Sequence, residues 1–172
     1  MNTFSNLFII ICVLCISSCQ KKEKFLTKSE KEWSELFNGN DLNNWIVKIK
    51  GYPLNENVNN TFRVENGVLK VSYDEYQSFD ASYGHIFYKK PFSSYKLRLE
   101  YRFIGNQVIG GASWAEKNSG VMVHSQSPES MKINQDFPVS IEVQLLGGLH
   151  QNEKRPTANL CTPGTYIIMN GI

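Results

Sequence analysis

The sequence predicts an all-β fold, an antiparallel β-sandwich or jelly roll, and three observations lead to this prediction. The segment 94–103 (SYKLRLEYRF) alternates apolar and polar side chains strictly, which is typical of a half-buried strand. Two β-rich runs flank Asn66 and Gly67, the strongest short signal for a β-hairpin. Further short runs are separated by stretches rich in Pro, Gly and Asn, which favours antiparallel strands over a parallel βα arrangement.

The same patterns place the expected strands along the chain. We expect strands at 45–49, 61–65, 68–73, 84–88, 94–103, 120–124 and 139–145. The residues expected to face the core are Tyr95, Leu97, Leu99, Tyr101 and Phe103 in 94–103, and Val139, Ile141, Val143 and Leu145 in 139–145. Only 29–36 suggests a helix, and it could equally be a turn into the first strand.

Composition and charge exclude several classes of protein. The 172 residues are 41% hydrophobic and 20% charged, which is a globular composition, and the length fits one domain. Lys and Arg number 18 against 16 Asp and Glu, and no basic block that could follow a phosphate backbone is present. We therefore expect no nucleic-acid partner. The sequence has no Gly-rich nucleotide-binding loop either, so no nucleotide cofactor is expected.

The N-terminus differs from the rest of the chain. Residues 8–16 (FIIICVLCI) form an apolar run too short to span a membrane, followed by Ser17, Ser18 and Cys19. This end resembles a bacterial lipobox, so we expect residues 1–19 to be a lipoprotein signal peptide with lipidation at Cys19, and 20–31 to be a tether. The alternative is a cleaved secretory peptide. The lipid would anchor an exported protein to a membrane of the bacterial envelope, in the periplasm or at the outer membrane, without crossing it.

Cys161 is the only cysteine that lies beyond the expected signal segment, so no internal disulfide is expected. A catalytic thiol is an alternative for Cys161, but no His or Lys close in sequence would activate it. The last residues, 166–172, are a β-rich run followed by Asn170 and Gly171, which is how a hairpin opens. Either a returning strand follows in a longer chain, or the last strand is an unpaired edge.

Strand alternation also predicts a polar surface. If the strands over 94–103, 120–124 and 139–145 share a sheet, one surface carries Arg98, Glu100, Arg102, Met122, His124, Glu142 and Gln144. Such a face, with Trp114 on a rim loop, suits the floor of a sugar-binding cleft. The alternative is a solvated outer face with no function, which any half-exposed antiparallel strand shows.

Six short motifs follow one another across residues 35–165. They are 35–45 (ELFNGNDLNNW), 62–69 (FRVENGVL), 97–103 (LRLEYRF), 118–121 (NSGV, expected to be a turn), 141–144 (IEVQ) and 159–165 (NLCTPGT). In this order they resemble the 3-keto-disaccharide hydrolase domain family, which is abundant in exported bacterial proteins.

The resemblance implies a concanavalin-like jelly roll over 32–172 that is incomplete at the C-terminus, where further strands and a cysteine partner for Cys161 would follow. It also implies cleavage of 3-keto-disaccharides or other glycosides whose sugar is already oxidised to a ketone at C3. Such a substrate requires a sugar oxidoreductase to supply it, and such a partner is therefore expected.

The chemistry assigns expected roles to the polar residues. A C3 ketone acidifies the proton on C2, so a base can remove it and the sugar on C1 can leave by elimination, after which water adds. Glu142 is expected to be the base or acid and His124 its proton-transfer partner, while Arg102, oriented by Glu100, would stabilise the enolate oxygen. Gln144, Asn118, Trp114 and Arg98 are expected to bind the sugar.

Two other functions remain open at this stage. A conventional glycosidase needs two carboxylates, for which Glu100 and Glu142 are the candidates, although Gln144 cannot ionise. A non-catalytic carbohydrate-binding module would need the aromatic and amide groups but no titrating pair. No cofactor is expected; His124, Glu100 and Glu142 could supply metal ligands, and a sugar-bound Ca²⁺ is an alternative, but no tight metal-binding spacing is present.

Overall fold

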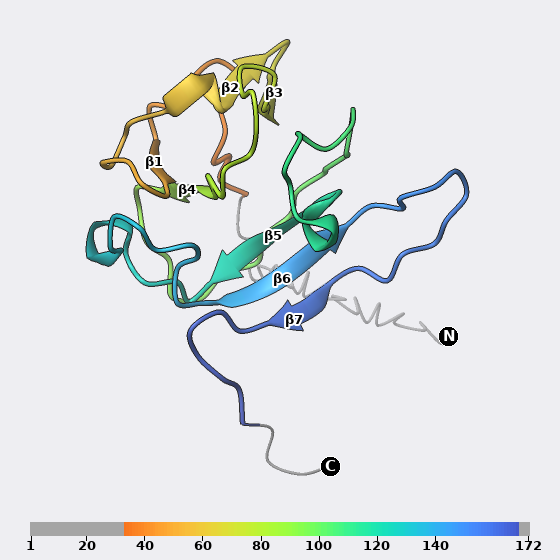
Figure 1. The fold of residues 1–172 in the computed structure, drawn as a ribbon. Helices are drawn as coiled ribbons and strands as arrows, with labels where there is room; N and C mark the ends of the chain where they lie inside the picture. The colour runs from red at the N-terminus through yellow and green to blue at the C-terminus, as the bar shows by residue number, and fades with distance from the viewer. Residues whose placement is uncertain (1–32, 169–172) are drawn as a thin grey trace, which may run out of the picture. The chain divides into compact units, whose positions relative to one another are not determined.

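The structure is a computed structural model that describes residues 33–168 (Figure 1). The chain divides into two units, Met1–Ser34 and Glu35–Ile172, and every element given below belongs to the second. Over the described residues the fold is all-β with antiparallel pairing, as the sequence predicts, and the only helical elements are three short 3-10 turns, η1 (Val58–Asn60), η2 (Ser113–Ala115) and η3 (Pro128–Ser130). The expected signal peptide, lipidation site and tether lie outside the described residues.

Strands β1 (Trp45–Ile49) and β4 (Gly84–Tyr88) form a two-stranded sheet, and both have the predicted bounds. One face of the pair carries the core, in which Val47, Ile49 and Phe62 are buried. Gly84 lies opposite Ile49 and makes room for the ring of Phe62, since a Cβ there would lie 3.0 Å from that ring. The apolar side chains of this sheet therefore pack against the next hairpin.

The predicted hairpin is confirmed as β2 (Phe62–Glu65) and β3 (Val68–Val71). Its two turn residues, Asn66 and Gly67, have φ values of 51° and 76°, the combination that a two-residue type I′ turn requires. Asn and Gly adopt these angles at the lowest cost, which is why the sequence predicts this hairpin correctly.

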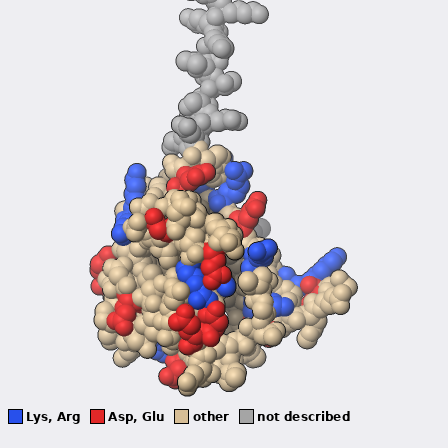
Figure 2. All heavy atoms as spheres, turned by 90° about the horizontal axis from the view of Figure 1, so that it is seen from above, with Lys and Arg blue, Asp and Glu red and all other residues tan. Residues whose placement is uncertain are grey.

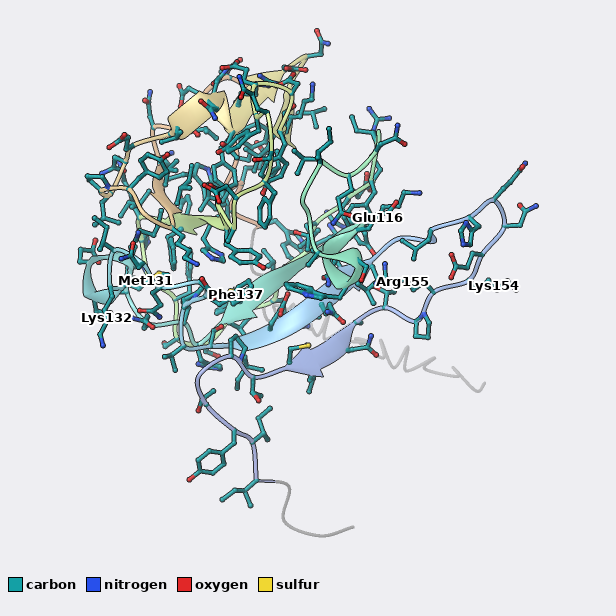
Figure 3. All side chains as sticks on the ribbon, viewed as in Figure 1. Glu116, Met131, Lys132, Phe137, Lys154 and Arg155 are labelled. Carbon is teal, nitrogen blue, oxygen red and sulfur yellow. The ribbon has the colours of Figure 1, made fainter. Side chains whose placement is uncertain are left out.

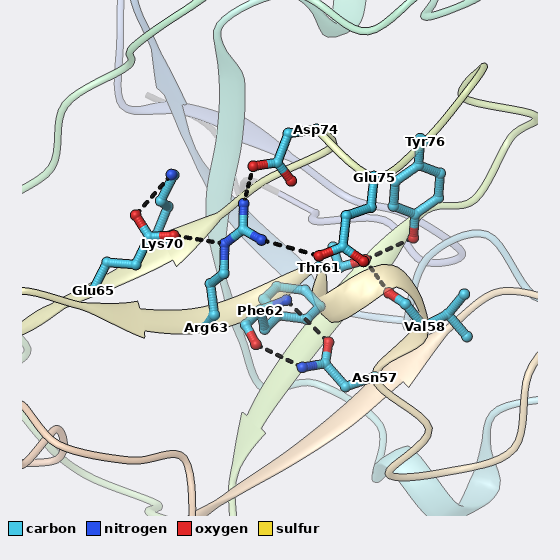
Figure 4. Close-up of polar contacts among 10 residues, drawn as sticks. All are labelled: Asn57, Val58, Thr61, Phe62, Arg63, Glu65, Lys70, Asp74, Glu75 and Tyr76. Carbon is cyan, nitrogen blue, oxygen red and sulfur yellow. Dashed lines mark hydrogen bonds and ion pairs between the residues drawn. The ribbon is translucent and has the colours of Figure 1, made fainter.

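A charged network covers this hairpin (Figure 4). Arg63 pairs with Asp74 and Glu75, and its Nε lies 2.8 Å from Oε1 of Glu65, close enough for an ion pair but without the alignment of a hydrogen bond. The hydrogen bond from Arg63 is the main reason that the pKa of Asp74 is lowered. The acidic partners are exposed, so the network adds little to the free energy of unfolding. On the face that Figure 2 shows, acidic and basic side chains are interspersed.

The largest sheet has the order β5 (Asn118–Val123), β6 (Ile141–Leu146) and β7 (Asn159–Cys161), all antiparallel. The predicted strand over 139–145 is thus shifted by one or two residues. Val139 lies outside it and is exposed, whereas the polar Ser140 is buried with its hydroxyl donating to the carbonyl of Pro138. The sequence 118–121, expected to be a turn, instead forms the first four residues of β5.

The expected strand over 94–103 is not formed. This segment belongs to none of the three sheets, and Tyr95, Leu97, Leu99 and Tyr101, which were expected to face the core, are each 43–46% exposed. Alternation shows that a segment suits a pleated surface, but a strand also needs a hydrogen-bonding partner, which the pattern cannot supply. Near its C-terminal end, the Tyr101 hydroxyl lies 3.3 Å from Oγ1 of Thr157, in the loop that precedes β7.

Neither end of the described chain forms a helix or a strand. Residues 33–36 are not helical, and 29–32 lie outside the described residues. Residues 166–168 form no strand and are exposed, and 169–172 again lie outside. In the part of the chain that the structure describes, no helix is long and apolar enough to cross a membrane.

Candidate active site

The candidate site is one face of the β5–β6–β7 sheet, here called the Glu142 face. Residues paired across an antiparallel ladder point to the same side of the sheet. Met122 pairs with Glu142, which pairs with Cys161, and Gly120 pairs with Gln144, which pairs with Asn159. The face therefore carries Asn118, Gly120, Met122, Glu142, Gln144, Leu146, Asn159 and Cys161. Three of the predicted site residues, Glu142, Gln144 and Asn118, come together here.

The side chain of Glu142 lies diagonally across β5, over Gly120. A Cβ built on Gly120 would lie 2.5 Å from Cγ and 2.7 Å from Cδ of Glu142, so any larger residue at this position would displace the carboxylate. A glycine within a strand marks a close approach of another group, and here that group is the carboxylate itself. The glycine of the 118–121 motif thus makes room for Glu142.

Glu142 has the electrostatics of a group that could carry a proton. It is half-buried in the middle of the sheet, and this burial raises the pKa of its carboxyl group. Removal of water disfavours the charged carboxylate. No nearby cation among the described contacts of Glu142 offsets this effect. A raised carboxyl pKa is the property that suits a general base or acid near neutral pH.

Asn118 connects the Glu142 face to Trp114. Its side-chain nitrogen donates to the carbonyl oxygen of Trp114 at 3.0 Å, so one half of the amide positions η2 instead of remaining available for a sugar. The turn at 116–117 follows η2 directly. It is held by Arg155, which donates to the carbonyl of Glu116 at 2.8 Å (Figure 3). Lys117 likewise donates to the carbonyl of Gly148 at 2.9 Å. The C-terminal part of the loop that carries Trp114 is therefore held by three hydrogen bonds.

Trp114 belongs to a group of three aromatic rings from different parts of the chain. Its ring is nearly parallel to that of Tyr83, which precedes β4, with 17° between the planes and 6.1 Å between the centroids. Phe137, which precedes β6 and is labelled in Figure 3, is tilted against both. Trp114 is still 53% exposed, so this group, the Trp114 platform, presents an open aromatic surface.

His85 lies beside this platform and was not singled out by the sequence. Its Nε2 lies 2.7 Å from the carbonyl oxygen of Asp136, and because a carbonyl only accepts, this nitrogen carries the proton. Burial is the main cause that lowers the pKa of His85; the bond to Asp136 opposes this effect, and the charge of Lys48 adds to it. Lys48 is itself buried and donates to the carbonyls of Ile49, Tyr52 and Ile133.

The lowered pKa of His85 predicts a loss of stability in acid. The unfolded chain binds the proton more readily than the fold, so the contribution of His85 is complete above its unfolded pKa of about 6.5 and is lost as the pH falls through the lower folded value. Urea unfolding followed from neutral to acidic pH should show this decline in the wild type and a flatter profile in His85→Gln. His150→Gln, at an exposed loop position, is the control and should keep the decline. A His85→Gln profile as steep as the wild type's would contradict the prediction.

The other predicted site residues lie elsewhere. His124 follows β5 in a left-handed conformation, with φ at 50°, and is exposed. Arg98, Glu100 and Arg102 lie on the segment 94–103, which is not part of the Glu142 sheet. Among the described residues no group of three His, Cys, Asp or Glu side chains could hold a metal ion, so the His124, Glu100 and Glu142 set is not assembled.

Cys161 is half-buried and lies on β7 opposite Glu142. Its cross-strand neighbour is thus a carboxylate and not the cation that activates a thiolate. This arrangement gives no support to the alternative of a catalytic thiol.

Four residues of the site were not identified as site residues from the sequence: Gly120, Tyr83, Phe137 and His85. A glycine inside a β-rich run can indicate close approach, and this signal could have identified Gly120. Tyr83, Phe137 and His85 carry no such signal, because only the fold brings them to Trp114 and Asp136.

The fold and the site define an antiparallel all-β protein with a half-buried carboxylate and amides on one sheet face. Over residues 32–168 the chain matches the 3-keto-disaccharide hydrolase family, described as a 3-keto-alpha-glucoside-1,2-lyase-like domain, and it belongs to that family. The resemblance found in the sequence is thus confirmed. No curated protein and no solved structure gives a significant match to the chain.

Proposed function

We propose that this protein cleaves the glycosidic bond of 3-keto-disaccharides or other 3-keto-glycosides by elimination followed by hydration. The observation that carries this proposal is the half-buried Glu142, fixed over Gly120 and with a raised pKa, in a chain whose family is described by a lyase acting on a 3-keto-glucoside. A lyase reaction at C1 and C2 begins with removal of a proton, and Glu142 is the described group best suited to take it.

The reaction proceeds in two steps, elimination and then hydration. Glu142 takes the proton from C2, the electron pair forms the C1–C2 double bond conjugated with the C3 ketone, and the C1–O bond breaks as the leaving oxygen receives that proton from Glu142, directly or through His124. One water molecule then adds its hydroxyl group to C1 and its proton to C2, which gives the free 3-keto sugar. The overall reaction is a hydrolysis, although no water attacks an intact glycosidic bond.

Other residues have supporting roles in this proposal. Gln144, on the same face as Glu142, would bind sugar hydroxyl groups. His124, exposed directly after β5, would pass protons to or from Glu142. Arg102, oriented by Glu100, would stabilise the enolate oxygen, and Arg98 would bind the sugar, although their segment lies outside the Glu142 sheet.

The cellular setting follows from the substrate and the N-terminus. A lipid on Cys19 would anchor the enzyme in the bacterial envelope, where oligosaccharides or glycosides enter. A sugar oxidoreductase would supply the C3 ketone. No metal or other cofactor takes part in the steps assigned to the chain's own residues.

Two other functions make different predictions. A conventional glycosidase needs a second carboxylate near Glu142, but Glu100 lies outside its sheet. A carbohydrate-binding module is favoured by one observation, the exposed ring of Trp114, and would bind sugars without turnover.

The experiment mixes the full chain with a disaccharide and, separately, with its 3-keto derivative, and follows the release of free sugar. Release from the 3-keto derivative alone is the expected result. Release from the unoxidised disaccharide would overturn the proposal in favour of a conventional glycosidase. Binding without release from either compound would overturn it in favour of a binding module.

A further inference from the structure

We infer that the Trp114 platform is a subsite for a second, unoxidised pyranose ring of the substrate, next to the Glu142 face. This inference rests on the proposed function and adds the chemical class of ligand that the neighbouring subsite takes. It predicts that the protein recognises a disaccharide or longer glycoside, and that part of this recognition does not depend on the C3 ketone.

The platform is a preformed aromatic surface. The rings of Tyr83 and Trp114 are nearly parallel, and Phe137 supports both, with its centroid 4.8 Å from that of Tyr83 and 6.5 Å from that of Trp114. Rings that already hold one another lose little conformational freedom when a ligand arrives. A pyranose ring has a flat face of C–H groups, which fits against an exposed aromatic face of this kind.

Polar groups next to the rings favour a sugar over a purely apolar ligand. Nζ of Lys50 lies 6.0 Å from the centroid of the Tyr83 ring and forms an ion pair with Asp136 at 2.6 Å. Asp136 directly precedes Phe137, and its carboxylate is half-exposed. Apolar surface with a few charged groups at its edge is the usual composition of a small-molecule site, and these groups can exchange hydrogen bonds with hydroxyls.

Asn118 connects the platform with the reacting centre. Its side chain belongs to the Glu142 face, and its amide donates to the carbonyl of Trp114. A ring on the platform would therefore belong to the unit attached to the 3-keto sugar at Glu142. Binding of such a remote unit can supply free energy that lowers the barrier at the reacting centre.

The test measures binding of unoxidised sugars, so it does not depend on turnover. The full chain carrying Glu142→Gln is titrated with maltose, cellobiose, sucrose and trehalose by calorimetry. The titrations are repeated with double variants that also carry Trp114→Ala, Trp114→Phe or Phe92→Ala. Phe92 is a matched control because this aromatic residue, 43% exposed, lies outside the platform. Urea unfolding of each variant checks that the fold is kept.

We expect at least one disaccharide to bind, Trp114→Ala to weaken it by about 10-fold, Trp114→Phe to retain most of the affinity, and Phe92→Ala to have no effect. Equal binding by a folded Trp114→Ala variant, or no binding of any of the four sugars, would overturn the inference. If Trp114→Ala loses binding but the wild type releases no sugar from a 3-keto-disaccharide, the subsite stands and the proposed reaction fails. If Trp114→Ala keeps its binding but the wild type does release sugar from a 3-keto-disaccharide, the subsite is refuted and the proposed reaction stands.

Discussion

Glu142→Gln is expected to reduce cleavage of a 3-keto-disaccharide by about 10²- to 10⁴-fold, the usual contribution of a general base. The amide has nearly the same shape as the carboxylic acid but cannot take the C2 proton. The loss should appear in kcat with little change in KM, because the amide leaves the sugar-binding groups in place. Steady-state release of free sugar measures both constants.

The same substitution is expected to raise the stability of the fold at neutral pH. Burial raises the pKa of Glu142 in the folded protein, so its charged form destabilises the fold above that pKa, and an uncharged amide removes this effect. Urea unfolding at pH 7 should therefore give a higher midpoint for the variant. Lower stability together with lost activity would assign Glu142 a structural role instead.

Gly120→Ala has the second largest expected effect. The backbone of a strand accepts alanine. However, the alanine Cβ would lie 2.7 Å from Cδ of Glu142, so the carboxylate must move away from β5. A displaced catalytic group can cost about 10²-fold in rate. The freed carboxylate gains water, so the acid limb of the pH–rate profile should also move to lower pH.

Ser119→Ala is the matched control for Gly120→Ala. Ser119 is the neighbouring residue on β5, it is exposed, and its side chain points to the opposite side of the sheet. We expect wild-type rate and pH profile from it. If Gly120→Ala loses activity while its acid limb stays in place, the loss does not come from the environment of Glu142.

The parts of the fold that the sequence predicted correctly are those decided by local chemistry. Asn66 and Gly67 specify their turn by their own φ preferences, and the bounds of β1 and β4 follow from short β-rich runs between turn residues. The segment 94–103 shows the limit of this reasoning. Its alternation is stricter than that of β5, yet pairing depends on a partner strand and not on the segment itself.

The candidate site, like the fold, was predicted from the sequence only where local sequence decides the structure. Glu142 and Gln144 lie two residues apart on one strand, so their shared face follows from the period of two alone. The approach of Glu142 to Gly120 and the meeting of Trp114 with Tyr83 and Phe137 depend on strand pairing and loop packing. The prediction of a turn at 118–121 was wrong because Gly120 makes room for the Glu142 side chain and does not mark a change of chain direction.

The most direct test of the proposed chemistry follows the hydrogen on C2 of the sugar. The wild-type protein cleaves a 3-keto-disaccharide in D₂O, and the released 3-keto sugar is analysed by NMR, with Glu142→Gln as the control. Elimination and hydration predict deuterium at C2 of the product, and slower cleavage of a substrate already deuterated at C2. A product that keeps its original hydrogen at C2, released at the same rate from both substrates, would contradict elimination and the role of Glu142 as its base.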